Sequence, residues 1–344
     1  DQGNEPRPKT DAVRGETMKQ HPVCPVCGSA ALRRIGERTE TVVDPPPNIQ
    51  QGGANAILRQ VLDCLSLKTE TLLCAQCRHL FLSPAFEEAE LDRLYSPGLT
   101  AETKRQYRES ERVSGKSWAE QNGIPAADQE ALRMAARNYR PRRLHDLVAA
   151  ICPPREIRKI LDFGARTGDL TERFPAECRR FVYDKDLSAV ADPGVVPLGS
   201  LEQVRANGPY DLIVLSHVLE HVPYPTRLLA ELGADLTSDG LLYVEVPIEY
   251  CGAILKRRGI PIGAHVNFFS RSSLLECIRL ASLRCVSIRR EIVPYGECQA
   301  PALKAITRPN GKGRRSVRRR PWPLDLLIDS LLTVRSRKAR KRFR

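Results

Sequence analysis

Short apolar runs alternate with amphipathic stretches over the second half of the chain. Between residues 158 and 309 the apolar runs have the length of strands, and the stretches between them carry apolar residues at helical spacing. Apolar strands that alternate with helices are typical of a parallel sheet covered on both faces. The expected strands are 159–163, 180–184, 210–216, 241–246, 284–293 and 302–307, and the expected helices are 168–174, 225–236 and 270–283.

The last two expected strands follow each other without a helix between them, so one of them should pair antiparallel. We therefore predict an α/β fold with a Rossmann-like, seven-stranded, mostly parallel sheet and one antiparallel strand. The predicted division of the chain is a disordered leader (1–17), a small cysteine-bearing module (18–90), a helical linker or lid (91–150), the sheet domain (151–308) and a basic tail with a short amphipathic helix (309–344).

The positive charge of the chain lies almost entirely in the tail. Lys and Arg number 54 against 41 Asp and Glu, a net charge of +13. Residues 308–344 hold 14 basic and 2 acidic residues, so the other 307 residues are close to neutral. A nucleic acid or an anionic membrane surface would therefore be attracted by the tail and not by the rest of the chain.

Two Cys-x-x-Cys pairs, Cys24/Cys27 and Cys74/Cys77, are separated by 46 residues. Four thiolates suit tetrahedral Zn²⁺, and a filled Cys₄ shell leaves no position for substrate, so the predicted site is a structural zinc-ribbon module. Four cysteines without a metal, iron in place of zinc, and Cys64 or His79 as substitute ligands remain open. The odd number of cysteines, 11, favours a reducing cytoplasm.

A glycine turn follows the first strand of the sheet domain, in the sequence Leu-Asp-Phe-Gly-Ala-Arg-Thr-Gly-Asp over 161–169. Without Cβ atoms, Gly164 and Gly168 let a ligand approach the backbone, where it would meet the positive end of the next helix. Asp184, twenty residues after Gly164, could accept hydrogen bonds from a ribose. Only the first glycine of a dinucleotide fingerprint is present, and two acids flank the turn. This pattern favours the cationic cofactor S-adenosylmethionine, and a plain strand–helix connection is the alternative.

At these residues the chain resembles the class I S-adenosylmethionine-dependent methyltransferases. The similarity runs through 161–170, 182–190, 210–222, 239–247 and 265–275, and with the cysteine quartet it extends to small-molecule and sugar methyltransferases that carry an N-terminal four-cysteine zinc module. The resemblance implies that the following residues bind the cofactor: Asp162, Phe163, Gly164, Ala165, Gly168, Asp184, Lys185, Ser200, Leu201, Ser216 and His217. Arg166 departs from the family, which usually has glycine there; pairing with Asp169 or Asp184 would accommodate it.

Candidate catalytic residues cluster after the fourth strand and before the last helix. Methyl transfer needs alignment of the nucleophile, and it needs a general base only when the acceptor is a hydroxyl or an acidic C–H. The candidates are His217, Glu220, His221 and His265. His217 and His221 are four residues apart, which would place them on one helical face.

The basic tail contains an aliphatic island over 322–334 between two clusters of Arg and Lys. An apolar stretch framed by cations is typical of a helix that lies on an anionic membrane surface. A polybasic arm on RNA is less favoured, and a helix docked on the protein's own core is the third reading.

The leading hypothesis is a methyltransferase that acts on a small-molecule or lipid-linked sugar acceptor in cell-envelope glycan or secondary metabolism. It would be cytoplasmic and peripheral at the inner face of the membrane. The alternatives are a tRNA or rRNA methyltransferase and a non-catalytic zinc-ribbon adaptor with a degenerate cofactor fold.

Overall fold

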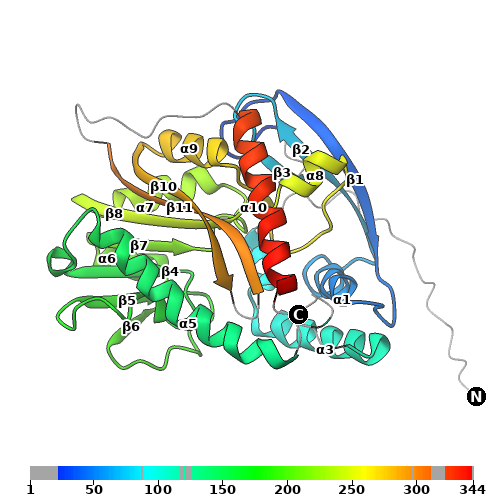
Figure 1. Cartoon of the computed structure of the whole chain (residues 1–344), viewed down its shortest axis with the longest axis horizontal. Coiled ribbons are helices and arrows are strands. Elements are labelled where there is room, and N and C mark those ends of the chain that lie inside the picture. The colour runs from blue at the N-terminus through cyan, green and yellow to red at the C-terminus, as the bar shows by residue number, and fades with distance from the viewer. Residues whose placement is uncertain are drawn as a thin grey trace, which may run out of the picture.

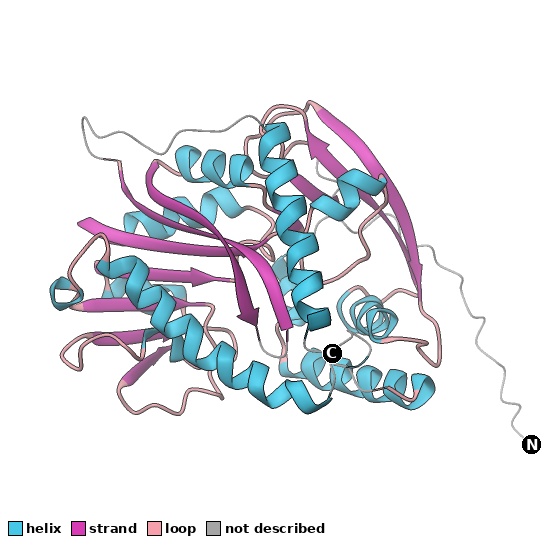
Figure 2. Ribbon diagram, in the orientation of Figure 1, coloured by secondary structure: helices cyan, strands magenta, loops and turns pink. Residues whose placement is uncertain are grey.

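The structure, a computed structural model, describes residues 22–84, 86, 88–116, 120, 126–295, 298–310 and 322–342. The leader expected over 1–17 and the part of the basic tail at 311–321 lie outside the described residues. Figures 1 and 2 show a large sheet on one side of the molecule and a smaller sheet with its own helices on the other.

The larger sheet has seven strands in the order β10-β11-β8-β7-β4-β5-β6. Counted along the chain within this sheet, the order is 3-2-1-4-5-7-6 when it is followed from β6. The strands are β4 (Lys159–Phe163), β5 (Arg179–Tyr183), β6 (Val195–Leu198), β7 (Tyr210–Ser216), β8 (Leu236–Pro247), β10 (Leu283–Tyr295) and β11 (Cys298–Pro309). Only β11 runs against its neighbours, pairing antiparallel with both β8 and β10. The predicted fold, a mostly parallel seven-stranded sheet with one antiparallel strand, is confirmed.

The edge strand β6 is the one that the apolar pattern did not indicate. It has four residues, and two of them, Val196 and Pro197, are exposed. Proline cannot donate to a ladder and is confined to edge strands or strand ends. A short edge strand of this composition has no apolar run to reveal it.

Alternate residues of the strands face two separate cores, as the period of two along a strand requires. Ile160 and Leu212 face α5 (Ala126–Ala149), which packs on one side of the sheet. Leu161 and Ile213 face the other side, with α7 (Pro225–Ala234) and α9 (Arg271–Leu280). The remaining helices of this half are α6 (Leu201–Asn207) and α8 (Cys251–Lys256), with a 3-10 turn, η2, at Pro154–Glu156.

The smaller sheet has the order β1-β2-β3-β9 and takes its last strand from the half of the chain that forms the larger sheet. Its strands are β1 (Leu32–Thr41), β2 (Ser66–Cys74), β3 (Leu80–Ser83) and β9 (Asn267–Phe268), with α1 (Ile49–Ala56) and the π-helix η1 (Ile57–Val61) between β1 and β2. Helices α2 (Glu88–Leu94) and α3 (Pro97–Ser114) follow. Phe81 and Phe268 belong to the same buried cluster as the core of the larger sheet. The two sheets therefore share one core.

The C-terminal helix α10 (Trp322–Arg342) packs on the protein itself, against β11, α8 and α9 (Figure 1). It is longer than the island expected over 322–334. Its acids Asp325 and Asp329 are buried and pair with Arg290 of β10, while four of its aliphatic residues are exposed. Leu324, Leu327, Leu331 and Val334 are 44%, 56%, 61% and 50% exposed. The ion pairs with Arg290 and the packing of Leu326 against the core both hold this helix in place.

None of the helices in the described ranges combines the length and the apolar character needed to cross a bilayer.

Candidate active site

The glycine turn at the end of β4 depends on the absence of two side chains. Gly164 and Gly168 have φ of +74° and +75°, in the left-handed region that favours glycine. A Cβ on Gly164 would lie 2.5 Å from Val218, and one on Gly168 would lie 2.7 Å from Val182. Glycine is therefore required at both positions, by conformation and by space.

The helix expected over 168–174 is wrong. The structure has only a 3-10 turn, η3 (Asp169–Thr171). Gly168 is left-handed, and Pro175 disfavours a helical conformation at the residue before it, so the segment has room for little more than one turn. A ligand at this turn does not meet the positive end of an α-helix. The expected contribution of a helix N-terminus to cofactor binding is therefore wrong.

Asp162, the last residue but one of β4, is a buried carboxylate without a hydrogen-bond partner among the described residues. Its side chain lies at the carboxyl end of the strand, the residue is 1% exposed, and neither oxygen accepts a hydrogen bond from the described residues. Burial raises the pKa of Asp162 to about 7, although the nearby Arg140 guanidinium opposes the shift. A buried carboxylate without a hydrogen-bond donor favours a cationic ligand, because a nearby positive charge would compensate for the water that the charged group lost on burial.

A cavity of about 650 Å³ opens in front of Asp162. One wall is the glycine turn, another is formed by Ser216 and His217 at the end of β7, and the third is α5. From α5 come the side chains of Arg133, Ala136, Arg137, Arg140 and Pro141. Arg140 donates to Ser216 Oγ at 2.8 Å, and Ser216 Oγ donates to Glu245 Oε2 at 3.1 Å. The arginines of α5 were not among the predicted site residues, because no local pattern connects that helix with the turn.

Of the eleven expected cofactor residues, six line this cavity: Asp162, Gly164, Ala165, Gly168, Ser216 and His217. The other five lie outside its lining. Phe163 packs against Tyr183, with ring centroids 4.7 Å apart. Lys185 pairs with Asp92 of α2, Ser200 caps α6 by accepting from Gln203 N, and Leu201 is exposed.

Asp184 follows β5 directly and is half-buried. Burial raises its pKa, although its Oδ1 accepts a hydrogen bond from Asp186 N at 2.9 Å. The carboxylate lies at the same edge of the sheet as the glycine turn, because both follow neighbouring parallel strands.

Arg166 is among the residues that line the cavity, and its side chain pairs with Asp186, at 3.3 Å between Nη2 and Oδ2. The expected pairing with Asp169 or Asp184 is therefore wrong. The side chain is 59% exposed, and the backbone at this position does not adopt positive φ. Arginine is accommodated here because neither the conformation nor the space calls for glycine.

The four candidate catalytic residues come together beside the cavity, although the segment 217–222 is a turn and not the helix that their spacing suggested. His217 has φ of +56° and places Nδ1 3.1 Å from Glu220 Oε1. His221 Nε2 lies 3.8 Å from the same oxygen, and the rings of His221 and His265 are 4.6 Å apart. Glu220 is fully buried.

The three histidines differ in charge state. Burial alone would lower the pKa of His217, but its contacts with Glu220 and Glu245 raise it to about 9. Burial lowers the pKa of His221, and Glu220 opposes this only in part. The pKa of His265 is raised, against the effect of burial, by its hydrogen bond to Glu249. His217 is therefore protonated at neutral pH and cannot act as a base, whereas His221 is neutral.

Tyr95 follows α2 directly and was not among the predicted site residues. Its ring meets His221 edge-on at 5.9 Å, and its hydroxyl is buried with no hydrogen-bond partner in the described ranges. Burial and the nearby carboxylates of Glu220 and Asp184 raise the pKa of Tyr95. The helical linker therefore contributes to the site at a residue for which the sequence carried no signal.

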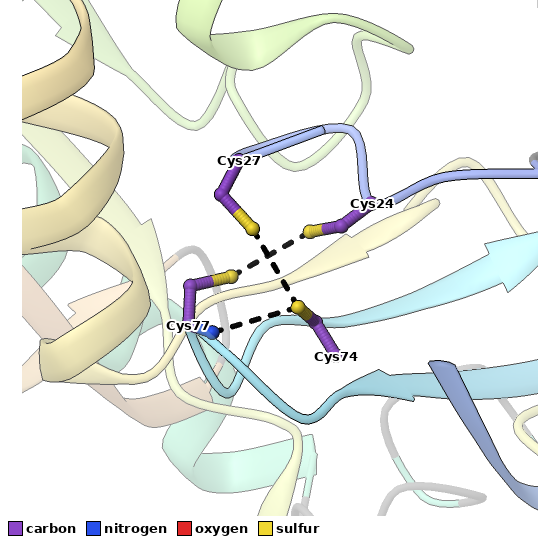
Figure 3. Close-up of side chains that lie close together, drawn as sticks. All are labelled: Cys24, Cys27, Cys74 and Cys77. Atoms are coloured by element: carbon purple, nitrogen blue, oxygen red, sulfur yellow. Dashed lines mark hydrogen bonds between the residues drawn. The ribbon is translucent and has the colours of Figure 1, made fainter. Parts of the chain in front are cut away.

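The cysteine quartet forms a compact thiol cluster at one end of the smaller sheet, with the two Cys-x-x-Cys turns facing each other (Figure 3). Sγ atoms lie 3.5 Å apart for Cys24 and Cys77 and 3.6 Å apart for Cys27 and Cys74, and none forms a disulfide. Tetrahedral Zn–S bonds of about 2.3 Å would set the sulfurs about 3.8 Å apart. The alternative ligands are engaged elsewhere: His79 hydrogen-bonds Asn267, and Cys64 belongs to a separate buried cluster.

Residues 136–288 match a family described as a methyltransferase domain. The match covers less than half of the chain, and it indicates a methyltransferase. The match begins within α5 and ends within β10, so it includes most of the helix that walls the cavity and the strands β4 to β8 of the larger sheet. The expectation of a class I S-adenosylmethionine-dependent enzyme is confirmed at this level. No curated protein sequence matches the chain.

Several solved methyltransferases are distantly similar to the chain. One is the 1,6-didemethyltoxoflavin-N1-methyltransferase of Burkholderia thailandensis with bound 1,6-didemethyltoxoflavin and S-adenosylhomocysteine: 18% identity, 68% of this chain, 96% of that chain, TM-score 0.39. Another is an S-adenosylmethionine-dependent methyltransferase from Clostridium acetobutylicum: 10% identity, 49% of this chain, 92% of that chain, TM-score 0.37. Likenesses with TM-scores below 0.5 establish neither a common fold nor a common substrate.

Proposed function

We propose that the methyltransferase domain transfers a methyl group from S-adenosylmethionine to a small-molecule or lipid-linked sugar acceptor of cell-envelope glycan or secondary metabolism. The observation that carries the cofactor side is the buried, unpartnered carboxylate of Asp162 in a cavity at the carboxyl end of β4. A dinucleotide would bring a pyrophosphate against this carboxylate, whereas the methionine end of S-adenosylmethionine brings an ammonium and a sulfonium.

The residues present fit that cofactor. Asp162 would hold the ammonium, and Arg140 or Arg137 on α5 would hold the carboxylate of the methionine end. Asp184 would accept hydrogen bonds from the ribose hydroxyls, and Lys185, Ser200 and Leu201 would flank the adenine. When bound, the cofactor supplies an already activated methyl group, so the protein's task is to align the acceptor and exclude water. Helix α5 covers the cavity and serves the second purpose.

The acceptor would reach the cofactor from the side of the smaller sheet. Two cavities, of about 740 and 540 Å³, lie between that half and residues 249–265. They share Gln50, Ile262, Gly263 and Ala264, and they border His265 and Tyr95 respectively. Their size suits a small ligand. His217, Glu220, His221 and His265 would then contact the acceptor, with the neutral His221 offering a lone pair and the charged His217 fixing Glu220.

Calorimetry with S-adenosylhomocysteine tests the cofactor assignment. Asp184→Ala removes two charge-assisted hydrogen bonds, so affinity should fall about 10- to 100-fold. Asp239→Ala, an exposed acid near the opposite end of the sheet, is the matched control and should leave affinity unchanged. If the wild-type chain fails to bind at millimolar concentration, the proposal is wrong and a non-catalytic adaptor is favoured.

The cysteine quartet is proposed to hold a structural Zn²⁺. Its support is the compact arrangement of four free thiols on two facing turns. All four positions of a tetrahedral ion would be filled by protein, which leaves none for substrate.

The outward aliphatic stripe of α10 (Leu324, Leu327, Leu331 and Val334) is the observation that favours an anionic membrane surface over RNA as a partner of the tail. Bare phosphates do not select aliphatic residues, whereas a lipid surface does. Replacing Leu327 and Leu331 by Gln leaves the Arg290 ion pairs intact. The double variant should lose co-sedimentation with phosphatidylglycerol vesicles. Binding to RNA that the variant retains, without binding to vesicles, would favour the RNA methyltransferase instead.

A further inference from the structure

Glu220, His221 and His265 form a cluster with the donor set of a metal site. One ligand atom from each residue lies within 4.8 Å of the ligand atoms of the other two. Two imidazoles and one carboxylate are the protein ligands of many catalytic zinc and non-haem iron sites. The three residues come from two segments, the turn after β7 and the loop before β9, which the hydrogen bonds from Val266 N and Asn267 N to Glu220 O hold together.

Both histidines are oriented as metal ligands usually are. His221 Nδ1 lies 3.0 Å from the carbonyl oxygen of Ala264, and His265 Nδ1 lies 2.6 Å from Glu249 Oε2. Imidazoles that bind metals almost always donate their other ring N–H to a carbonyl or a carboxylate, which leaves the remaining nitrogen with its lone pair. In both residues that remaining nitrogen is Nε2.

The third ligand, the Glu220 carboxylate, also has an oxygen that could bind an ion. Glu220 is fully buried, and neither oxygen receives a well-directed hydrogen bond from the described residues. One oxygen, Oε1, already lies 3.1 Å from His217 Nδ1, so Oε2 is the oxygen that a further cation would meet. The ring of Tyr95, whose buried hydroxyl forms no hydrogen bond within the described ranges, lies edge-on to His221 of the same cluster.

We propose that Glu220, His221 and His265 bind a divalent transition-metal ion on the acceptor side of the active site. The inference deepens the proposed function and rests on it for the role of the ion, but not for its binding. Three protein ligands leave coordination positions free, and His265 borders the larger of the two acceptor cavities. The ion would therefore select acceptors with a hydroxyl or another oxygen ligand, and it would favour the deprotonated form of that oxygen.

Manganese titration of the full chain, followed by the electron paramagnetic resonance signal of free Mn²⁺, tests the site. Nitrogen and oxygen ligands suit Mn²⁺ and thiolates do not, so the cysteine quartet does not compete. One Mn²⁺ should bind per chain. His265→Ala and Glu220→Gln should weaken binding by at least about 10-fold, and Glu249→Gln, which only orients His265, should weaken it by about 10-fold.

His145→Ala is the matched control, since His145 lies on α5 against Phe174 and away from the cluster, and it should bind Mn²⁺ as the wild type does. His265 is the decisive position, because its side chain is 32% exposed and its loss should not prevent folding, which circular dichroism verifies. Absence of Mn²⁺ binding by the wild-type chain, or binding that all three variants retain, would overturn the proposal. Calorimetry with S-adenosylhomocysteine on the same samples separates this outcome from failure of the cofactor assignment.

Discussion

Asn267 accepts a hydrogen bond from His79 Nε2 at 2.8 Å, across a sequence separation of 188 residues. His79 follows the second Cys-x-x-Cys turn, and Asn267 opens β9, which pairs with β3. The amide of Asn267 also donates to the carbonyl oxygens of Leu219 and Val222, at 3.3 and 2.6 Å. Because these two residues flank Glu220 and His221, the cysteine module is joined to the turn that carries the candidate catalytic residues.

Asn267→Ala should therefore destabilise the whole protein and not a surface loop. The change leaves His79 and two carbonyl groups buried without the side chain that pairs them, which costs about 1–3 kcal/mol for each group left unsatisfied. Denaturant unfolding measures the loss. Asn207→Ala, on the half-exposed end of α6, should stay within about 0.5 kcal/mol of wild type. Equal effects of the two changes would contradict a structural role of Asn267.

Asp162→Asn should stabilise the ligand-free protein at high pH and not at low pH. The folded pKa of about 7 lies above the unfolded value of 3.8, so the stability contributed by Asp162 is present below pH 3.8 and is lost as the pH rises towards 7. Asparagine resembles the protonated acid and does not titrate. The free energy of unfolding of the variant should exceed that of the wild type by almost nothing at pH 4 and by about 4 kcal/mol at pH 8.

Thermal melts of both proteins across this pH range measure the difference. Saturating S-adenosylhomocysteine should reverse the order at pH 8, since only the carboxylate gains from an ammonium. A variant that shows the same advantage at pH 4 and pH 8 would mean that Asp162 is not the titrating group.

Arg166→Gly should change cofactor affinity by less than about fivefold. Arg166 is mostly exposed and pairs with Asp186, and exposed ion pairs contribute about 0–1 kcal/mol. Calorimetry with S-adenosylhomocysteine measures the effect, with the exposed Arg173→Gly as control. A gain in affinity of tenfold or more would show that the guanidinium obstructs the cavity.

Removal of metal from the cysteine quartet should unfold the module and weaken the active site with it. Structural zinc supplies folding free energy directly, so a strong chelator should lower the melting temperature, and Cys77→Ser should do the same without chelator. Cys152→Ser, a cysteine outside the quartet, is the control. Elemental analysis of the purified wild type should find at least one zinc ion per chain. A wild-type protein that contains no zinc, and whose melting temperature the chelator does not change, would exclude a structural metal.

Local patterns in the sequence were enough for the strands β4, β7 and β11, the glycine turn and the two Cys-x-x-Cys pairs. In each case the determining features lie within a few residues of one another: an apolar run, a glycine that no side chain can replace, or a fixed ligand spacing. The parallel sheet followed from their order, because apolar strands that alternate with helices have few other ways to bury their faces.

Only the tertiary structure decided the rest. It paired Arg166 with Asp186, turned the acids of α10 towards Arg290, brought the arginines of α5 to Asp162 and set Tyr95 beside His221. It also shortened the helix after Gly168 to a single turn. These contacts join segments far apart in the chain, and they depend on which side chains meet once the cores are packed. Periodicity reports which face of an element is buried, but not which residue of another element will lie against it.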